Sequence, residues 1–193
     1  RDPLWSRGLG DVYKRQDIDE IPNLENINFK NFNEKLIFFN QEMFYDRFNL
    51  KLPNYNWVGT KACKKRHLQS PQWLRNIKDK KYPYYRFDIF FSETKFFNII
   101  FKNEGGWHFT NLKSADEIKH KLESYLHHRE FDLNPLSVEE IDNLIKNHQA
   151  IYDLKVDKRV QKIGYGNKLE KCDLKKLPSY INNNLNKFKD WIE

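Results

Sequence analysis

The order of apolar and polar positions predicts strands in the first half of the chain and helices in the second. Aromatic and β-branched side chains dominate short runs bounded by Pro, Asn and Gly, which is typical of strands. Pro53-Asn54 is expected to end the runs before it, and Gly105-Gly106 is expected to turn the chain into a neighbouring strand. The predicted strands cover residues 35–39, 43–50, 56–62, 96–101 and 107–110.

Helical periodicity follows capping signals. Ser114 and Glu117 have the spacing of a capping box, ahead of apolar positions that fall on one helix face over residues 115–126. Ser137 and Glu140 repeat this spacing, and prolines mark the first turn of the other helical segments. The predicted helices begin at residues 71, 115, 138 and 178.

Strands first and helices last indicate one mixed α/β domain with a helical C-terminal tail. No internal repeat and no Gly/Ser linker divides the chain of 193 residues, and 16% of its residues are aromatic, which argues against disorder. No run approaches the roughly 20 apolar residues of a membrane span. The two cysteines have neither metal-site spacing nor a disulfide framework, so a reduced compartment is the default expectation.

The start of the chain differs in character from the rest. Residues 6–16 resemble the translation of a transposon-type sequencing adapter and contain no apolar signal-peptide core. We therefore expect residues 1–16 to lie outside the fold. Residues 17–193 are then expected to be the C-terminal part of a larger domain whose upstream part was lost, and we expect that part alone to be inactive or nearly so.

Asp17 and Asp19 are the strongest chemical signal in the sequence. Two carboxylates one residue apart, followed by Glu20-Ile21-Pro22, suit Mg²⁺ or Mn²⁺, which take oxygen ligands and leave positions for phosphate. A solvated acidic turn is the alternative for an isolated Asp-x-Asp pair.

The sequence resembles glycosyltransferase family 17 in several blocks, which occur in the order seen in that family. Phe109 departs from the family's animal members, which have a cysteine after Gly-Trp-His. The blocks are Asp17–Pro22, Gly105–Thr110, Lys121–Tyr125 with Glu130-Phe131, and Leu177–Ile181.

The resemblance implies a partial GT-A-like fold and an inverting, metal-dependent transfer of N-acetylglucosamine from UDP-GlcNAc to a hydroxyl of a glycan or glycoprotein. The family includes β-1,4-mannosyl-glycoprotein 4-β-N-acetylglucosaminyltransferases. By this likeness Asp17 and Asp19 match the metal motif, with Mn²⁺ or Mg²⁺ as the cofactor. His108 matches the family's Gly-Trp-His block, and Glu130 falls at an acidic position. A cytoplasmic location would fit a bacterial or viral source, and a Golgi-type membrane a eukaryotic one; no membrane anchor lies in this part.

An inverting transfer also needs a base for the acceptor hydroxyl. Glu130 is the first candidate, with Asp132 and Glu20 behind it; a surface carboxylate is the alternative for Glu130. His108 is a candidate metal ligand, diphosphate donor or packed core residue. The expected substrate-binding residues are Trp107, Gly106 and Glu20, since an aromatic face can stack on a pyranose and glycine allows close backbone approach.

Two other functions remain open. The chain has a formal net charge of +7, and basic runs at residues 61–66 and 78–81 lie close to several tyrosines. This pattern is compatible with a nucleic-acid-binding module, although no base-reading motif accompanies it and nucleic acid is not the expected partner. A carbohydrate-binding domain without turnover is the other alternative.

Overall fold

The computed structural model describes residues 12–25, 27, 29, 35–124, 129–152, 163–164 and 166–193, and for Glu130 the backbone alone. The chain divides into two compact units. Unit 1 holds the described residues up to Glu42 together with Asn56–His108, and unit 2 holds Met43–Tyr55 and Phe109–Glu193.

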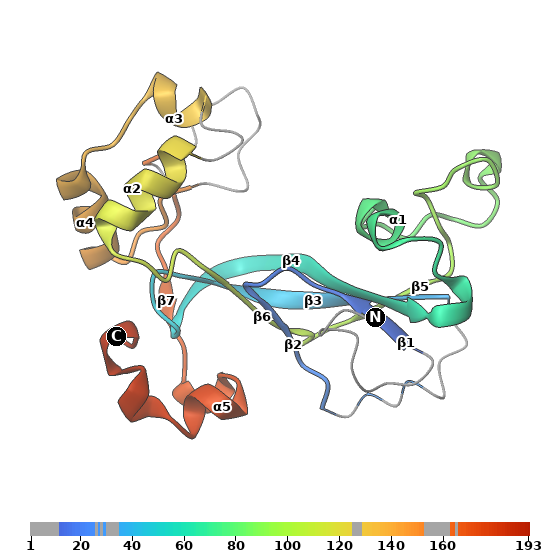
Figure 1. Cartoon of the computed structure of the whole chain (residues 1–193), viewed down its shortest axis with the longest axis horizontal. Helices are drawn as coiled ribbons and strands as arrows, with labels where there is room; N and C mark the ends of the chain where they lie inside the picture. Colours follow the sequence, from blue (N-terminus) through green and yellow to red (C-terminus); the bar gives the residue numbers. More distant parts are fainter. Residues whose placement is uncertain are drawn as a thin grey trace. The chain divides into compact units, whose positions relative to one another are not determined.

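The fold is α/β with a mixed sheet, as the sequence predicts (Figure 1). The described strands form a sheet in the order β1-β4-β3-β6-β2, with β5 paired to β3 and β7 paired to β4. The strands are β1 Val12–Arg15, β2 Glu20–Pro22, β3 Leu36–Tyr45, β4 Leu50–Lys64, β5 Ile99–Lys102, β6 Gly106–Thr110 and β7 Glu170–Lys171. The helices are α1 Pro71–Asn76, α2 Ala115–Ser124, α3 Arg129–Leu133, α4 Val138–Lys146 and α5 Ser179–Asn182.

β1 corrects one expectation, because residues 12–15 lie inside the fold. The strand pairs antiparallel with the end of β4, in a register that places Val12 opposite Lys64 and Arg15 opposite Lys61. Val12 and Tyr13 are buried. Two apolar side chains followed by two cationic ones are enough to complete this edge of the sheet, whatever the origin of the segment.

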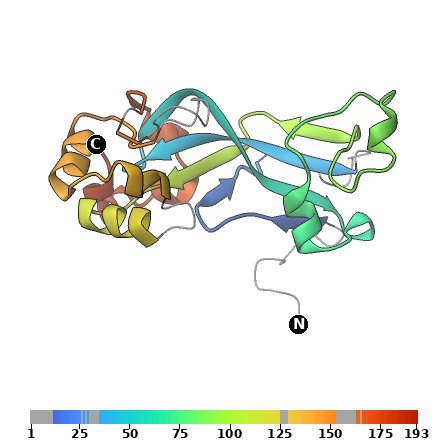
Figure 2. The same ribbon diagram turned by 90° about the horizontal axis from the view of Figure 1, so that it is seen from above.

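β3 and β4 are longer than the predicted runs, and they are the two long strands of Figure 2. The break expected at Pro53-Asn54 is wrong, because both residues lie within β4. Asn54 has a positive φ of 55°, a conformation that asparagine tolerates better than most residues. Proline occurs within strands where the ladder is irregular, so the pair distorts β4 without ending it.

The hairpin expected at Gly105-Gly106 is also wrong, because β5 and β6 both pair with β3. The glycines instead allow close approach of neighbouring backbone. A Cβ on Gly105 would lie 2.8 Å from the Asn40 nitrogen, and one on Gly106, at φ +129°, would lie 2.1 Å from the Ile21 oxygen. Gly106 therefore lets β2 pair tightly with β6.

Unit 1 has an aromatic and aliphatic core that joins the sheet to α1. The Ser70 hydroxyl accepts a hydrogen bond from the Trp73 N–H at 3.0 Å, and Pro71 occupies the first turn, as predicted. Trp73 and Leu74 are buried by this helix. The core consists of Tyr13, Leu36, Phe38, Cys63, Trp73, Leu74, Ile77 and Ile99.

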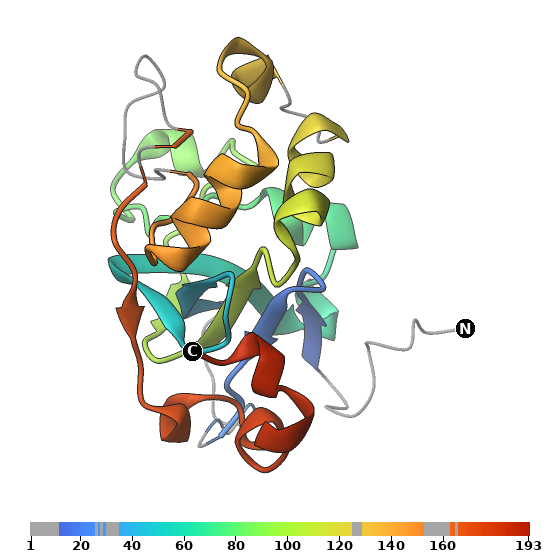
Figure 3. The same cartoon turned by 90° about the vertical axis from the view of Figure 1, so that its left-hand side faces the viewer.

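Unit 2 has a helical core, and α2 and α4 lie side by side in it (Figure 3). Both predicted capping boxes are present: Ser114 N–H donates to Glu117 Oε2 at 2.9 Å, and Ser137 N–H donates to Glu140 Oε2 at 2.7 Å. Ile118 and Ile141 are fully buried between the helices. The last segment is a series of short helical turns rather than one helix. No described helix has the length and apolar character needed to cross a bilayer.

Candidate functional site

The two blocks that carry the strongest chemistry in the sequence meet in unit 1 as adjacent strands. β2 and β6 pair antiparallel, with Glu20 opposite His108 and Pro22 opposite Gly106. Residues more than 80 positions apart in the chain therefore contribute side chains to one small region.

Glu20 is a buried carboxylate that holds the loop before β2. Only 2% of its surface is exposed. Its Oε1 accepts a hydrogen bond from Trp57 Nε1 at 3.0 Å, and its Oε2 accepts one from the Asp17 N–H at 3.0 Å. The Glu20 N–H donates back to the Asp17 carbonyl at 3.2 Å. Both carboxylate oxygens are thus engaged within the protein, so Glu20 positions Asp17 and is not arranged as the substrate ligand or base expected from the sequence.

Gln41 extends this buried polar group across the sheet. Its Oε1 accepts a hydrogen bond from the Thr60 N–H at 3.2 Å, and its Nε2 lies 3.4 Å from the Trp107 carbonyl. Gly59 packs against both side chains, and a Cβ there would lie 2.2 Å from Gln41 Oε1 and 2.6 Å from Glu20 Cδ. Sequence reasoning missed Gln41 and Gly59, because nothing in their local sequence reports which strands will be neighbours.

His108 connects the buried group to the acidic loop. Its Nε2 lies 3.2 Å from Asp19 Oδ2, and its ring centroid lies 5.1 Å from that of Trp57 at an interplanar angle of 47°. The residue is 7% exposed, and its buried Nδ1 has no hydrogen-bond partner among the described residues. The imidazole therefore directs Nε2 toward Asp19, and the Trp57 ring restricts its orientation.

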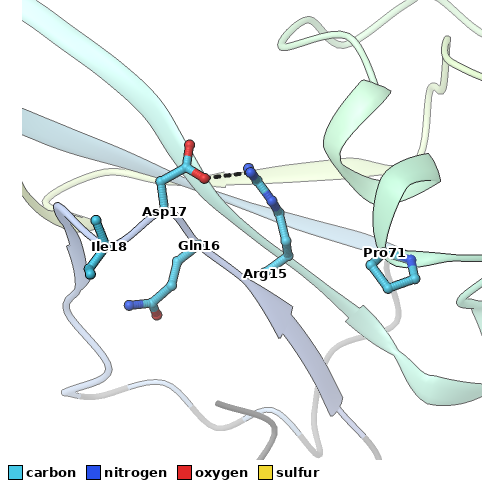
Figure 4. A pocket seen from close by; sticks show the side chains of 5 residues that line it. All are labelled: Arg15, Gln16, Asp17, Ile18 and Pro71. Atoms are coloured by element: carbon cyan, nitrogen blue, oxygen red, sulfur yellow. Dashed lines mark hydrogen bonds and ion pairs between the residues drawn. The ribbon is translucent and has the colours of Figure 1, made fainter. Parts of the chain in front are cut away.

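Asp17 points to a different partner. Its Oδ1 lies 2.5 Å from Arg15 Nη2, and the side chain is 45% exposed (Figure 4). Arg15 belongs to the adapter-like start, so this ion pair ties the first aspartate to a segment that we expected outside the fold. The pair lines an open hollow of about 540 Å³ together with Gln16, Ile18 and Pro71. The exposed Ile18 side chain separates the two aspartates in the loop.

The candidate ligand side chains at this site provide only part of the coordination shell of a divalent ion. Asp19 and His108 present an oxygen and a nitrogen to the same region, while Asp17 is turned to Arg15. Across the described residues no group of three His, Cys, Asp or Glu side chains is arranged to hold an ion. Mg²⁺ and similar ions are often bound through one or two protein ligands, with water and substrate phosphate completing the shell. The residues present fit an ion shared with a ligand, and not one enclosed by protein.

The other predicted residues are placed as follows. Trp107 is half-buried on β6 opposite Ile21, and Gly106 begins that strand. Asp132 is exposed on α3 in unit 2. Glu130 lies on the same helix, but its side chain is outside the described part of the chain, as are the neighbouring His127 and His128.

Lys61 changes the interpretation of the first basic run. The residue is only 4% exposed, and its Nζ donates to the Ile77 carbonyl at 2.6 Å and pairs with Asp79 at 2.6 Å. It also lies 4.9 Å from the Phe38 ring centroid. This cation stabilises the end of α1 and is not presented to a ligand.

Asp46 in unit 2 is a buried acid that the sequence does not reveal. It is fully buried, and neither carboxylate oxygen has a hydrogen-bond partner among the described residues. Burial raises the pKa of this carboxyl to about 7, although Arg47 and Lys121 act in the opposite direction.

Comparison of the chain with family models, with curated proteins and with solved structures found no match.

Proposed function

We propose that this chain belongs to an inverting, metal-dependent glycosyltransferase of the family 17 type, with a GT-A-like fold, that moves N-acetylglucosamine from UDP-GlcNAc to a glycan hydroxyl. The observation that supports this most is the pairing of β2 with β6. That pairing brings Asp19 of the Asp-x-Asp-Glu-Ile-Pro block within 3.2 Å of His108 of the Gly-Trp-His block.

In this proposal Asp19 and His108 bind the cation on the donor diphosphate. A bound Mn²⁺ or Mg²⁺ would neutralise the charge that develops on the diphosphate as it leaves. Glu20 and Trp57 keep the loop and the imidazole in place through the hydrogen bond at 3.0 Å between them. Asp17 would join the ligands only after leaving Arg15, which holds it at 2.5 Å.

The acceptor half of the reaction needs a base. The acceptor oxygen attacks the anomeric carbon while the bond to the diphosphate oxygen breaks, and a carboxylate removes the hydroxyl proton. Glu130 remains the candidate, with Asp132 second. Glu20 is disfavoured for this role because its two oxygens already accept hydrogen bonds inside the protein.

Donor binding tests the proposal without requiring an acceptor. In saturation-transfer difference NMR, the difference signals of UDP-GlcNAc should become stronger when Mg²⁺ is added, because the cation promotes binding of the donor. Asp19→Asn should remove most of that gain, because it removes a charged ligand of the cation. Asp116→Asn, at an exposed position on α2, is the matched control and should behave as wild type.

A UDP-GlcNAc signal that does not change on addition of Mg²⁺, or that is equal in Asp19→Asn and wild type, would contradict the proposal.

Binding assays on the same protein distinguish the alternative functions. A non-catalytic carbohydrate-binding domain would bind the glycan and not the nucleotide. A nucleic-acid-binding module would bind single strands with a steep salt dependence, a function that the buried and paired Lys61 does not favour.

A further inference from the structure

The segment between α1 and β5 in unit 1 exposes an unusual number of large aromatic side chains. Figure 1 draws it in green, as a loop with one short helical turn. We call its exposed aromatic residues the aromatic patch. Their exposed fractions are 73% for Tyr84, 71% for Tyr85, 83% for Phe87, 68% for Phe90, 90% for Phe91 and 45% for Phe97.

The loop is held in place from within, so the exposure does not come from a lack of structure. Asp88 accepts from Arg86 Nε at 2.8 Å and from Lys95 Nζ at 2.7 Å, and Ile89 is buried as an anchor. The Lys78 N–H donates to the Thr94 carbonyl at 2.8 Å, which closes the base of the loop. The protein thus orders this segment and still leaves its phenylalanines in water, which is costly unless a partner covers them.

The charges around the aromatic patch select the partner. The loop holds three acidic residues: Asp79 is paired with Lys61, Asp88 is paired with Arg86 and Lys95, and Glu93 is exposed. The exposed Lys78, Lys80 and Lys81 outnumber Glu93, so the loop that carries the phenylalanines keeps an excess of positive charge. Phenylalanine can stack on a sugar or a base but cannot form a hydrogen bond that selects one, whereas it partitions well into the interfacial region of a bilayer. Cations beside apolar side chains are the combination that anionic lipid surfaces bind.

We propose that the aromatic patch is a membrane-docking surface, which inserts Phe87, Phe90 and Phe91 among the acyl chains of an anionic bilayer while Lys80 and Lys81 contact lipid headgroups. Side chains that are 83% and 90% exposed extend into solvent, and a deformable bilayer accommodates them without a matching pocket. This proposal does not depend on the transferase function, because none of its residues belongs to the site on β2 and β6.

Vesicle flotation with the full chain tests the proposal. The protein should float with vesicles that contain phosphatidylserine and much less with neutral phosphatidylcholine vesicles. Phe90→Ser with Phe91→Ser should weaken binding to anionic vesicles by at least about tenfold, because it removes the inserted side chains. Lys80→Glu with Lys81→Glu should abolish the preference for anionic lipid.

Leu133→Ser with Tyr180→Ser is the matched control, since these side chains are 87% and 64% exposed in unit 2. It should bind vesicles as wild type does, and circular dichroism should show all variants folded. Failure of the wild type to float, or equal flotation of the phenylalanine variant, would overturn the proposal. Two other results would also overturn it, if the wild type does not bind vesicles. One is a dimer in sedimentation that the phenylalanine variant does not form, and the other is binding to single-stranded RNA that this variant loses.

Discussion

Glu20 and Asp46 are both buried acids, but the two units of the molecule surround them very differently. Glu20 in unit 1 accepts hydrogen bonds from an indole N–H and a backbone N–H, both at 3.0 Å. Asp46 in unit 2 has no such donor among the described residues, and burial raises its pKa to about 7. The difference shows that donors within reach, and not burial alone, decide what a buried carboxylate costs.

The two positions also have different local reasons for an acid. Asp46 has a φ of 62° at the end of β3, where asparagine, aspartate and glycine are the residues best tolerated. The positive φ at this position therefore accounts for the choice of aspartate. Glu20 sits in regular extended structure, so its carboxylate is retained for the contacts that it makes with Asp17 and Trp57.

The largest effect is expected from Glu20→Ala, which leaves the Trp57 indole and the Asp17 N–H without an acceptor. Urea unfolding should show a loss of about 4 kcal/mol in the free energy of unfolding. Glu20→Gln, which keeps the size and one acceptor, should lose about half as much. Glu123→Ala, at an exposed α2 position, is the control and should change stability by no more than about 0.5 kcal/mol. A Glu20→Ala protein as stable as this control would remove the distinction between the two acids.

Asp46→Asn is expected to act in the opposite direction and to depend on pH. The pKa of Asp46 is raised in the folded state, so the folded protein holds the proton more tightly and loses stability as pH rises from about 4 to about 7. The variant removes that loss. At about pH 8 it should be more stable than wild type by up to about 3 kcal/mol, and near pH 4 the two should be equal. A difference that is the same at both pH values would mean that the charge of Asp46 is not its cause.

Gly59→Ala should cost roughly 2 kcal/mol, because the added methyl group overlaps Gln41 Oε1 and Glu20 Cδ at 2.2 and 2.6 Å. The same substitution should weaken the Glu20–Trp57 hydrogen bond, which the chemical shift of the Trp57 indole proton reports. If the stability falls while that shift stays unchanged, the methyl group is accommodated on the Gln41 side.

Trp57→Phe should have the smallest effect, about 1 kcal/mol, since it removes one donor to Glu20 and keeps an aromatic ring against His108. Combined with Glu20→Ala it should add almost nothing, because the two residues share one interaction. Full additivity in thermal or urea unfolding would show that the hydrogen bond does not couple them.

Local signals predicted the parts of the fold that depend on neighbouring residues. The helix starts at Ser70, Ser114 and Ser137 are confirmed because each cap is completed within three residues. Strand lengths and partners were predicted less well, as at Pro53 and Gly105, because they depend on distant parts of the chain. Lys61 illustrates the same limit. The basic run at residues 61–66 is typical of a solvent-exposed surface, but the register of β4 places the side chain of Lys61 in the protein interior.

The candidate site was predictable as two motifs but not as a structure. The residues Asp19 and His108 were both named from the sequence, whereas the buried supports Gln41 and Gly59 were not. Which aspartate faces the imidazole follows from the turn that Glu20 closes with Asp17, and no periodicity reports such a turn. Asp46 was missed for the same reason, since its burial is decided by elements packed around it.

The most direct test of the site is paramagnetic broadening of the histidine ring signals by Mn²⁺, which detects weak binding without any donor or acceptor. If Asp19 and His108 bind the cation together, the His108 signals should broaden at Mn²⁺ concentrations that leave His120, exposed on α2, sharp. Asp19→Asn should remove this selectivity. Equal broadening of His108 and His120, or selective broadening that persists in Asp19→Asn, would contradict a cation site at β2 and β6.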